Sequence, residues 1–418
     1  MTTPVPLLEP RDGLPSVVDS PAQLARVAAA FAAGTGPVAV DAERASGYRY
    51  GQRAYLVQLR RAGAGTALID PIGCPDLGTL GEAIADAEWV LHAASQDLAC
   101  LAEVGLHPQR IFDTELGGRL AGLDRVGLGP MVEELLGLTL EKGHSAADWS
   151  RRPLPESWLR YAALDVEVLV ELRDTLEEDL RRQGKLDWAL EEYAAVLAAA
   201  PPSPRVEPWR RTSGIHRVKG RRQLAAVRAL WEERDRVARE RDVAPGRILT
   251  DAAIVTAALA NPKTEAELLR LATFGGRSTK RLAPAFFGAL ASASDLAEAQ
   301  LPLMTPPTGD GPPPSSRWAE RDPRAAARLA RARAGLGEVA TLYRLPLENL
   351  LAPDSVRRLA WTPPNPLSRE TVAVALRGMG TRAWQIELTA GPLANALVEP
   401  PEAAEPEALS PKRLSPKP

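Results

Sequence analysis

The sequence of 418 residues predicts an α/β domain followed by two all-helical domains. Up to about residue 113, short apolar runs rich in β-branched residues alternate with helical segments, which is typical of an α/β sheet. Beyond that point apolar residues recur at helical spacing, and two Pro-rich stretches interrupt them. The predicted parts are an N-terminal extension (1–16), the α/β domain (17–200), a linker (201–214), a helical domain (215–296), a second linker (302–316), a second helical domain (318–398) and a disordered tail (399–418).

Turn and capping residues place the elements of the α/β domain. Ser20 and Pro21 start a helix as N-cap and first-turn residues, and the helix stops at Gly34. Pro155 opens a long helix that continues apolar through Leu172. The N-terminal extension is expected to be ordered only by docking. The other predicted elements are strands at 37–43, 55–60, 67–70, 89–92 and 111–113, helices at 77–85 and 128–136, and a loop at 139–154.

Three short stretches carry acidic residues in contexts that suggest one site. Asp41 and Glu43 end an apolar strand and point to the same face, because strand side chains alternate. Two carboxylates so placed repel each other unless a cation lies between them, and Mg²⁺ prefers oxygen ligands. Asp97 follows the strand at 89–92, and Tyr161 and Asp165 share a helix face at i, i+4 spacing. Each stretch alone is more often a solvated strand end, a cap or a surface pair, so their combination carries the prediction.

In this order and with these flanks, the stretches resemble the DEDD superfamily of 3′→5′ exonucleases in its tyrosine-bearing branch, and ribonuclease D in particular. The flanking segments that narrow the resemblance are Val57-Gln58-Leu59, Phe112-Asp113-Thr114 and Asp148-Trp149-Ser150-Arg151-Arg152-Pro153-Leu154. The resemblance covers residues 17–190, with weaker similarity to about 395. It implies a ribonuclease H-like mixed sheet, whereas spacing alone gives no more than α/β.

The resemblance also implies two divalent metal ions, Mg²⁺ or Mn²⁺, at the carboxylates. Asp41 would bridge both ions, Glu43 and Asp165 would complete the ligands of one, and Asp97 would serve the other. Tyr161 would position or deprotonate the attacking water. Because an unperturbed phenol has a pKa of about 10, positioning is the better-supported role.

Three further residues of the α/β domain are candidates for substrate contact. His92 lies at a strand end and would help to shape the nucleotide pocket, although a histidine there is more often structural. Trp149 and Arg151 precede Tyr161 in the chain. For Trp149, packing against the helix is the more common role.

One position departs from the pattern of the family. Ribonuclease D sequences usually place an aromatic residue after the glutamate, and here Arg44 follows Glu43. If that aromatic contacts the terminal nucleotide, either substrate binding differs in this chain or Tyr48 or Tyr50 takes over the contact.

The region after the first linker resembles the HRDC domain, a small helical module of helicases and ribonuclease D. The resemblance rests on residues 243–249 and 261–264, beside expected helices at 221–241, 248–259, 265–270 and 279–290. A degenerate repeat then appears 102 residues later, where Leu350-Leu351, Val356 and Pro364 correspond to Ile248-Leu249, Ile254 and Pro262. A second HRDC-like domain is therefore predicted at 318–398.

Charge is unevenly distributed although the net charge is only −2. Residues 205–250 hold 13 Lys or Arg against 6 Asp or Glu, and residues 317–377 hold 11 Arg against 6 acids. Basic helical domains behind an acidic catalytic domain would suit contacts with phosphates, although solvated helix faces in an Arg-rich protein give the same counts. Arg221, Arg222 and Arg228 are the first candidates for RNA contact.

Cysteine content and the amino terminus indicate a cytoplasmic protein. Cys74 and Cys100 lack metal-ligand spacing, exclude a disulfide framework, and are expected to be buried. The first residues show no signal-peptide pattern, and no apolar run reaches the length of a membrane span.

The leading interpretation is a 3′→5′ exoribonuclease that trims structured RNA such as tRNA precursors, without a small-molecule cofactor. The preference for RNA over DNA rests on the resemblance alone, so a 3′→5′ DNA exonuclease is the first alternative. A catalytically inactive RNA-binding adaptor is the second. The complete set of carboxylates argues against an adaptor, since an inactive site would be free to lose them. The sequence leaves the oligomeric state open.

Overall fold

The computed structural model describes residues 3–141, 143–144, 146–201, 203–305 and 311–398. The chain forms two compact units, Met1–Pro307 and Thr308–Pro418, and each is described by itself. The predicted disordered tail at 399–418 lies outside the described residues. In the part of the chain that is described, no helix is both long and apolar enough to span a bilayer.

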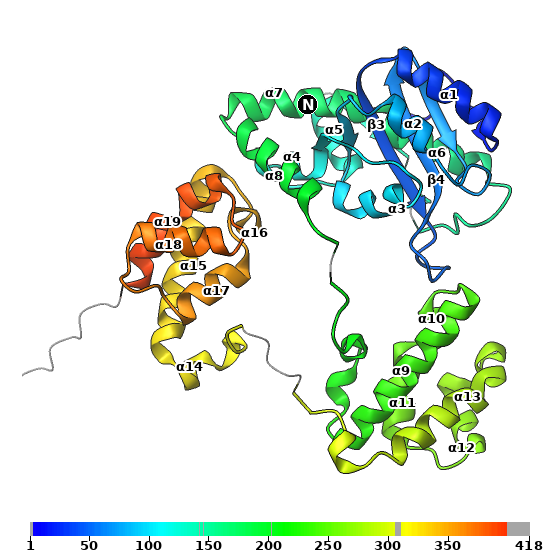
Figure 1. The fold of residues 1–418 in the computed structure, drawn as a ribbon, viewed down its shortest axis with the longest axis vertical. Helices are drawn as coiled ribbons and strands as arrows, with labels where there is room; N and C mark the ends of the chain where they lie inside the picture. The colour runs from blue at the N-terminus through cyan, green and yellow to red at the C-terminus, as the bar shows by residue number, and fades with distance from the viewer. Residues whose placement is uncertain (1–2, 142, 145, 202, 306–310, 399–418) are drawn as a thin grey trace, which may run out of the picture. The chain divides into compact units, whose positions relative to one another are not determined.

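The first unit contains a six-stranded mixed sheet in the order β2-β5-β4-β3-β6-β7 (Figure 1). Strands β3, β4 and β5 form an antiparallel meander, whereas β6 and β7 extend it in parallel from β3, and β2 pairs in parallel with β5. This confirms the mixed sheet that the family resemblance implied. The strands are β2 Val17–Val18, β3 Thr35–Arg44, β4 Ala54–Ala62, β5 Gly65–Ile69, β6 Trp89–Leu91 and β7 Ile111–Asp113.

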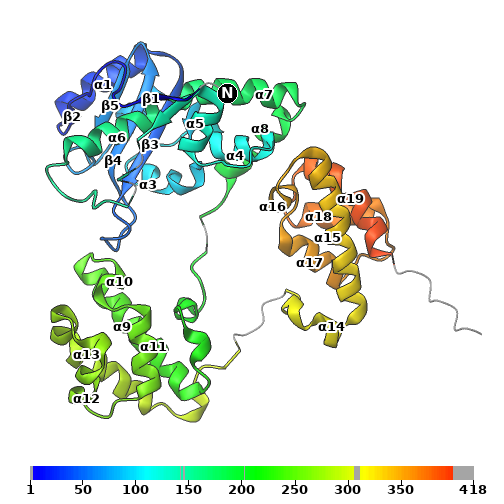
Figure 2. The same cartoon turned by 180° about the vertical axis from the view of Figure 1, so that it is seen from behind.

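Strand β3 lies between β4 and β6, which explains its apolar run. Val38, Ala39 and Val40 are completely buried, because helices cover both faces of the sheet. Figures 1 and 2 show α6 (Glu156–Glu167) on one face and α1 (Pro21–Ala33) on the other. The other helices of this domain are α2 Gly78–Ala83, α3 Leu98–Ala102, α4 Thr114–Ala121, α5 Leu128–Leu136, α7 Leu169–Arg182 and α8 Leu186–Ala198.

Two features of this domain differ from the predictions. The long helix after Pro155 is interrupted at Val168, between α6 and α7. The predicted loop at 139–154 instead begins with part of a strand, β8 (Leu138–Leu140), which pairs in parallel with β1 (Val5–Leu7). The partner strand lies more than a hundred residues away in the chain, so no local pattern marks it. This pairing orders part of the N-terminal extension, which docks as predicted.

The first helical module consists of five helices within the first unit. Its central helix α9 spans Arg221–Arg241, as predicted, and buries the stripe Leu224, Val227 and Leu230. Together with residues of α11 and α13, this stripe forms a separate apolar core. The other helices are α10 Pro245–Ile248, α11 Asp251–Ala260, α12 Glu265–Arg270 and α13 Arg277–Ser294.

The second unit is a second helical module with the same order of elements. Helix α15 (Pro323–Tyr343) and helix α9 both have 21 residues and begin 102 positions apart. Each is followed by a four-residue helix at the same offset, and each ends at a left-handed residue, Asp242 or Arg344. The other helices are α14 Trp318–Arg321, α16 Leu347–Leu350, α17 Pro353–Trp361, α18 Arg369–Gly378 and α19 Ala383–Leu397.

Candidate active site

Strand β3 and helix α6 bring three carboxylates together. Asp41 and Glu43 lie on the same face of β3, and α6 packs against that strand. Asp165 projects from α6 toward them, so that one carboxylate oxygen from each residue lies within 4.8 Å of the others. The three residues line a pocket of about 650 Å³. The structure therefore assembles the charges that the sequence placed in two distant stretches.

A tight turn after β6 places Asp97 in the same pocket. Ala93 adopts a left-handed conformation with φ of 61°, which turns the chain out of the strand. The Asp113 carboxylate accepts hydrogen bonds from the backbone N–H groups of Ala93 and Ala94, at 3.0 and 2.9 Å. Asp97 then precedes α3 and lines the pocket, where it forms an ion pair of 3.3 Å with Arg44. The turn therefore fixes the position of the fourth carboxylate.

Tyr161 lies one helical turn before Asp165 and lines the same pocket. Its hydroxyl donates a hydrogen bond to the Asp165 carboxylate. The ring of His144 meets the tyrosine ring edge-on, with centroids 5.8 Å apart. The five predicted catalytic side chains thus lie around one pocket.

The electrostatics of the pocket are dominated by negative charge in a buried place. Burial, together with the nearby Asp41, Asp165 and Asp97, raises the pKa of Glu43 to about 10. Burial and Asp41 raise the pKa of Asp97 to about 8, against the opposing effect of Arg44. In this environment the carboxylates favour protonation, or a cation that replaces the protons.

The donor set fits a divalent cation such as Mg²⁺ or Mn²⁺. Carboxylate oxygens are hard ligands, and three of them converge within the distance that a single ion can bridge. Their raised pKa values show that the charges lack full compensation by protein groups. Asp41, Glu43 and Asp165 could hold one cation, and Asp97, which lines the same pocket, could serve as a ligand for another.

His92 lines the pocket beside these acids. Its Nδ1 lies 2.9 Å from the Thr114 hydroxyl, which donates to the backbone carbonyl of Leu91 at 3.1 Å. Burial lowers the pKa of His92 to about 4, so the ring is neutral near pH 7. A neutral, hydrogen-bonded ring at the pocket wall suits the predicted contact with a nucleotide, which stays a prediction.

Trp149 and Arg151 lie in different environments. Trp149 is completely buried against Trp158, with ring centroids 5.3 Å apart, and its indole N–H donates to the carbonyl of His144. It therefore supports the wall behind Tyr161, and substrate contact does not fit this placement. Arg151 is exposed and outside the residues that line the pocket, and its contact with RNA stays a prediction.

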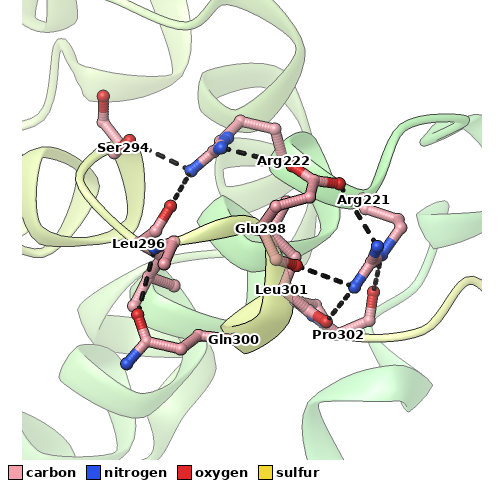
Figure 3. Close-up of polar contacts among 9 residues, drawn as sticks. Arg221, Arg222, Ser294, Leu296, Glu298, Gln300, Leu301 and Pro302 are labelled. Carbon is pink, nitrogen blue, oxygen red and sulfur yellow. Dashed lines mark hydrogen bonds and ion pairs between the residues drawn. The ribbon is translucent and has the colours of Figure 1, made fainter.

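Two of the three arginines proposed for RNA contact are engaged within the first helical module (Figure 3). The guanidinium of Arg221 donates to the carbonyls of Leu301 and Pro302, at 2.7 and 3.2 Å. Arg222 donates to the carbonyls of Ser294 and Leu296 at the end of α13. Both also form ion pairs with Glu298. Arg228 is partly exposed on the same helix.

Tyr48 and Tyr50 turn toward the first helical module and away from the pocket. The Arg247 guanidinium lies 3.9 Å from the centroid of the Tyr48 ring, and the Tyr50 hydroxyl contacts Asp235. Of the two alternatives for the missing aromatic residue, contact through these tyrosines is therefore disfavoured.

The pocket also contains acidic residues that the sequence analysis did not single out, namely Glu115 and Glu141. Glu115 follows the N-cap Asp113 of α4, and its i, i+4 ion pair with Arg119 is a local signal for a surface pair rather than for a pocket. Glu141 follows β8, which the sequence did not predict. Neither position carried a local feature that marked it as part of the site.

Family models match three parts of the chain. One described as 3'-5' exonuclease matches residues 15–181, and one described as HRDC domain matches residues 223–290. A model described as the 3' to 5' exonuclease C-terminal domain matches residues 311–397, which form the second helical module. The HRDC-like character of this second module stays a prediction, supported by its shared order of helices.

Individual relatives extend over most of the chain. A ribonuclease D of Granulibacter bethesdensis is 33% identical over 288 residues, which span 66% of this chain and 71% of the relative. The crystal structure of a protein from Bifidobacterium adolescentis matches with a TM-score of 0.86 and 38% identity, over 94% of this chain and 99% of the other. Escherichia coli RNase D, described as an exoribonuclease involved in structured RNA processing, matches with a TM-score of 0.65 and 28% identity, over 91% and 98%.

Proposed function

The chain belongs to the ribonuclease D family, and from this premise we propose that it is a metal-dependent 3′→5′ exoribonuclease that trims structured RNA. The observation that carries the proposal is the convergence of Asp41, Glu43 and Asp165 within 4.8 Å, beside Asp97 and Tyr161 in one pocket. The family membership supports a nuclease, and the carboxylates supply the ligands that phosphodiester hydrolysis with two divalent cations requires.

The carboxylates would hold two cations, which when bound would generate a nucleophilic hydroxide and neutralise charge on the leaving 3′-oxygen. Asp41, whose charge acts on Glu43, Asp97 and Asp165, would serve both positions. Glu43 and Asp165 complete one position, and Asp97 belongs to the other. Mg²⁺ and Mn²⁺ both prefer such oxygen ligands.

Tyr161 would position the attacking water. Burial, together with Asp165 and Glu43, raises the pKa of its phenol, so the hydroxyl keeps its proton near neutral pH. A protonated hydroxyl that is held by Asp165 offers its oxygen to a water as an acceptor, and does not itself remove a proton. The neutral ring of His92 would line the place where the terminal nucleotide lies.

RNA with structured 3′ regions, such as tRNA precursors, is the proposed substrate, and the cytoplasm is the proposed location. Support for RNA comes from the family, since E. coli RNase D is described as acting in structured RNA processing. The two basic helical modules would add contacts with phosphates along a longer RNA.

A comparison of labelled RNA and DNA oligonucleotides, each with Mg²⁺ and with EDTA, tests the proposal. We expect stepwise shortening of RNA from the 3′ end that EDTA abolishes. Equal or preferential shortening of DNA would instead indicate a DNA exonuclease. Binding of RNA without any shortening in Mg²⁺ or Mn²⁺ would indicate an adaptor.

A further inference from the structure

Arg44 ends β3 at the point where the pairing of β3 with β4 changes register, directly after Glu43. Along a regular strand, neighbouring residues face opposite sides of the sheet. The register shift lies between Glu43 and Arg44, where Tyr55 is the extra residue of β4. At this irregular end of the strand, Arg44 lines the same pocket as Asp41 and Glu43.

In this pocket Arg44 has an unusual electrostatic position. Among the lining residues that the structure describes, it is the one with a permanently positive side chain, beside a set of six carboxylates. One guanidinium nitrogen, Nη2, lies 3.3 Å from Oδ1 of Asp97, and the arginine side chain is only 25% exposed. The ion pair is thus shielded from water more than a typical surface pair.

The ion pair divides the carboxylates into two groups. Asp41, Glu43 and Asp165 converge within 4.8 Å, and Asp97 does not belong to that group. Arg44 forms its ion pair with Asp97, and its charge also lowers the pKa of Asp41 and Glu43, against the larger effect of burial. The protein therefore presents one open cation position and a second position whose proposed ligand, Asp97, is already paired with a positively charged side chain.

We propose that Arg44 is a built-in counter-ion for Asp97 that a second divalent cation must displace, so that the two cations bind in sequence. The inference rests on the proposed metal-dependent function and adds a positioning residue to it. A divalent ion beside Asp97 would lie close to the guanidinium, and like charges in a partly buried pocket repel strongly. The first cation, held by Asp41, Glu43 and Asp165, does not face this competition directly.

A merely structural ion pair would have the opposite effect on cation binding. If Arg44 only held Asp97 in place, its removal would free the carboxylate and weaken binding of the second cation. If Arg44 competes with that cation, its removal should strengthen binding. The sign of the change in affinity therefore separates the two roles.

The test is titration of the full-length protein with Mn²⁺ in the absence of RNA, with free Mn²⁺ measured by electron paramagnetic resonance. The unaltered protein should bind one Mn²⁺ tightly and a second weakly. In Arg44→Gln the Kd of the second Mn²⁺ should fall at least about tenfold, because a positive charge beside the ion is lost. Arg44→Lys keeps the charge and should keep the weak second binding.

Two comparisons make the test specific. Arg119→Gln removes a positive charge that pairs with Glu115, another acid of the pocket, and should leave the second Kd unchanged. In an Asp97→Asn background, Arg44→Gln should have no effect, because the carboxylate for which Arg44 and the second Mn²⁺ compete is gone. Circular dichroism of each variant checks that it is folded.

Unchanged or weaker second binding in Arg44→Gln would overturn the inference, as would an equal effect of Arg119→Gln. Tight binding of the second Mn²⁺ by Arg44→Lys would overturn the inference too, because the positive charge would then not be the cause of the weak binding. Absence of any Mn²⁺ binding by the unaltered protein would refute the proposed metal site itself. This last outcome is distinct from a failure of the Arg44 inference alone, in which Mn²⁺ still binds.

Discussion

The hydroxyl of Tyr50 lies 3.1 Å from Oδ1 of Asp235, which joins the loop after β3 to helix α9 of the first helical module. Arg239 donates a hydrogen bond to the same hydroxyl, and the backbone N–H of Ala244 donates to the carbonyl of Tyr48. The strand that carries Asp41 and Glu43 is therefore linked to the helical module through the loop that follows Arg44.

Replacing Tyr50 by Phe should loosen this link while the ring keeps its packing against the apolar core of the module. The change removes a hydrogen bond to a charged group, which is commonly worth about 1.5–3 kcal/mol. We expect faster proteolysis of the connecting segment between α8 and α9. Arg236→Ala serves as the control, because Arg236 forms its ion pairs with Glu233 and Glu240 on its own helix. Equal cleavage rates for Tyr50→Phe and the control would argue against the link.

Asp41→Asn should remove most of the catalytic activity. It withdraws the negative charge that both proposed cation positions share, and one such contact is commonly worth at least about a hundredfold in rate. The fold should survive in EDTA, since the substitution relieves repulsion with Glu43. The measurements are kcat/KM on a short single-stranded RNA and the Tm in EDTA, with the exposed Asp124→Asn as control. Near-normal turnover with Mg²⁺ would contradict the assignment of the site.

Tyr161→Phe should lower kcat with little change in RNA affinity. The substitution deletes the hydroxyl that Asp165 holds and keeps the ring against His144. If the hydroxyl orients the attacking water, we expect a loss of about ten- to a hundredfold in kcat. Single-turnover rates and binding in EDTA separate the two effects. A parallel loss of binding would assign Tyr161 to substrate contact instead of chemistry.

The elements that the sequence predicted accurately are those with local signals. The helix Pro21–Ala33 begins after Ser20 with Pro21 in its first turn and ends before Gly34, as predicted. The four carboxylates and Tyr161 were found because their spacing resembles a known family. Within the described residues, the structure brings all five to one pocket.

The features that sequence analysis missed depend on contacts between distant segments. Strand β8 exists because Val5–Leu7 pairs with it, and no residue near 138 indicates such a partner. The ion pair of Arg44 with Asp97 joins the end of β3 to the turn after β6, which are far apart in the sequence. Arg221 and Arg222 looked like solvent-exposed cations on a helix, yet the last residue of α13 and the segment that follows it supply carbonyl partners for both.

Arg222 is bound to carbonyls of its own module, whereas Arg228 is partly exposed, so the two arginines carry opposite expectations. Arg228→Glu should weaken binding of tRNA-length RNA by about three- to tenfold and reduce the slope of log affinity against log salt by about 1. Arg222→Ala should lower Tm instead, because it leaves the Ser294 and Leu296 carbonyls without their partner, and should leave the slope unchanged. RNA affinity over a range of salt, with the Tm of each variant, provides the measurement. Identical slopes for Arg228→Glu and the unaltered protein would mean that this face of α9 does not bind phosphates.

Removal of divalent cations should make the stability of the protein depend more strongly on pH. In the absence of cations, burial raises the pKa of Asp97 to about 8 and that of Glu43 to about 10. In the unfolded chain both pKa values lie near 4. A group whose folded pKa is raised contributes stability that is complete below its unfolded pKa and is lost as the pH rises through its folded pKa.

In EDTA, the Tm should therefore fall as the pH rises from about 6.5 to 9, because the unfolded chain has released protons that folded Asp97 keeps up to about pH 8 and folded Glu43 up to about pH 10. Bound Mg²⁺ compensates the ionised carboxylates, so the Tm with Mg²⁺ should fall less, and the difference between the two conditions should grow with pH. Taking that difference removes the general effect of pH on the rest of the protein. Asp97→Asn deletes one titrating carboxylate, so the difference in Tm between Mg²⁺ and EDTA should grow less with pH in this variant. A difference in Tm that is equal at every pH would show that these carboxylates do not carry the predicted protons in the cation-free protein.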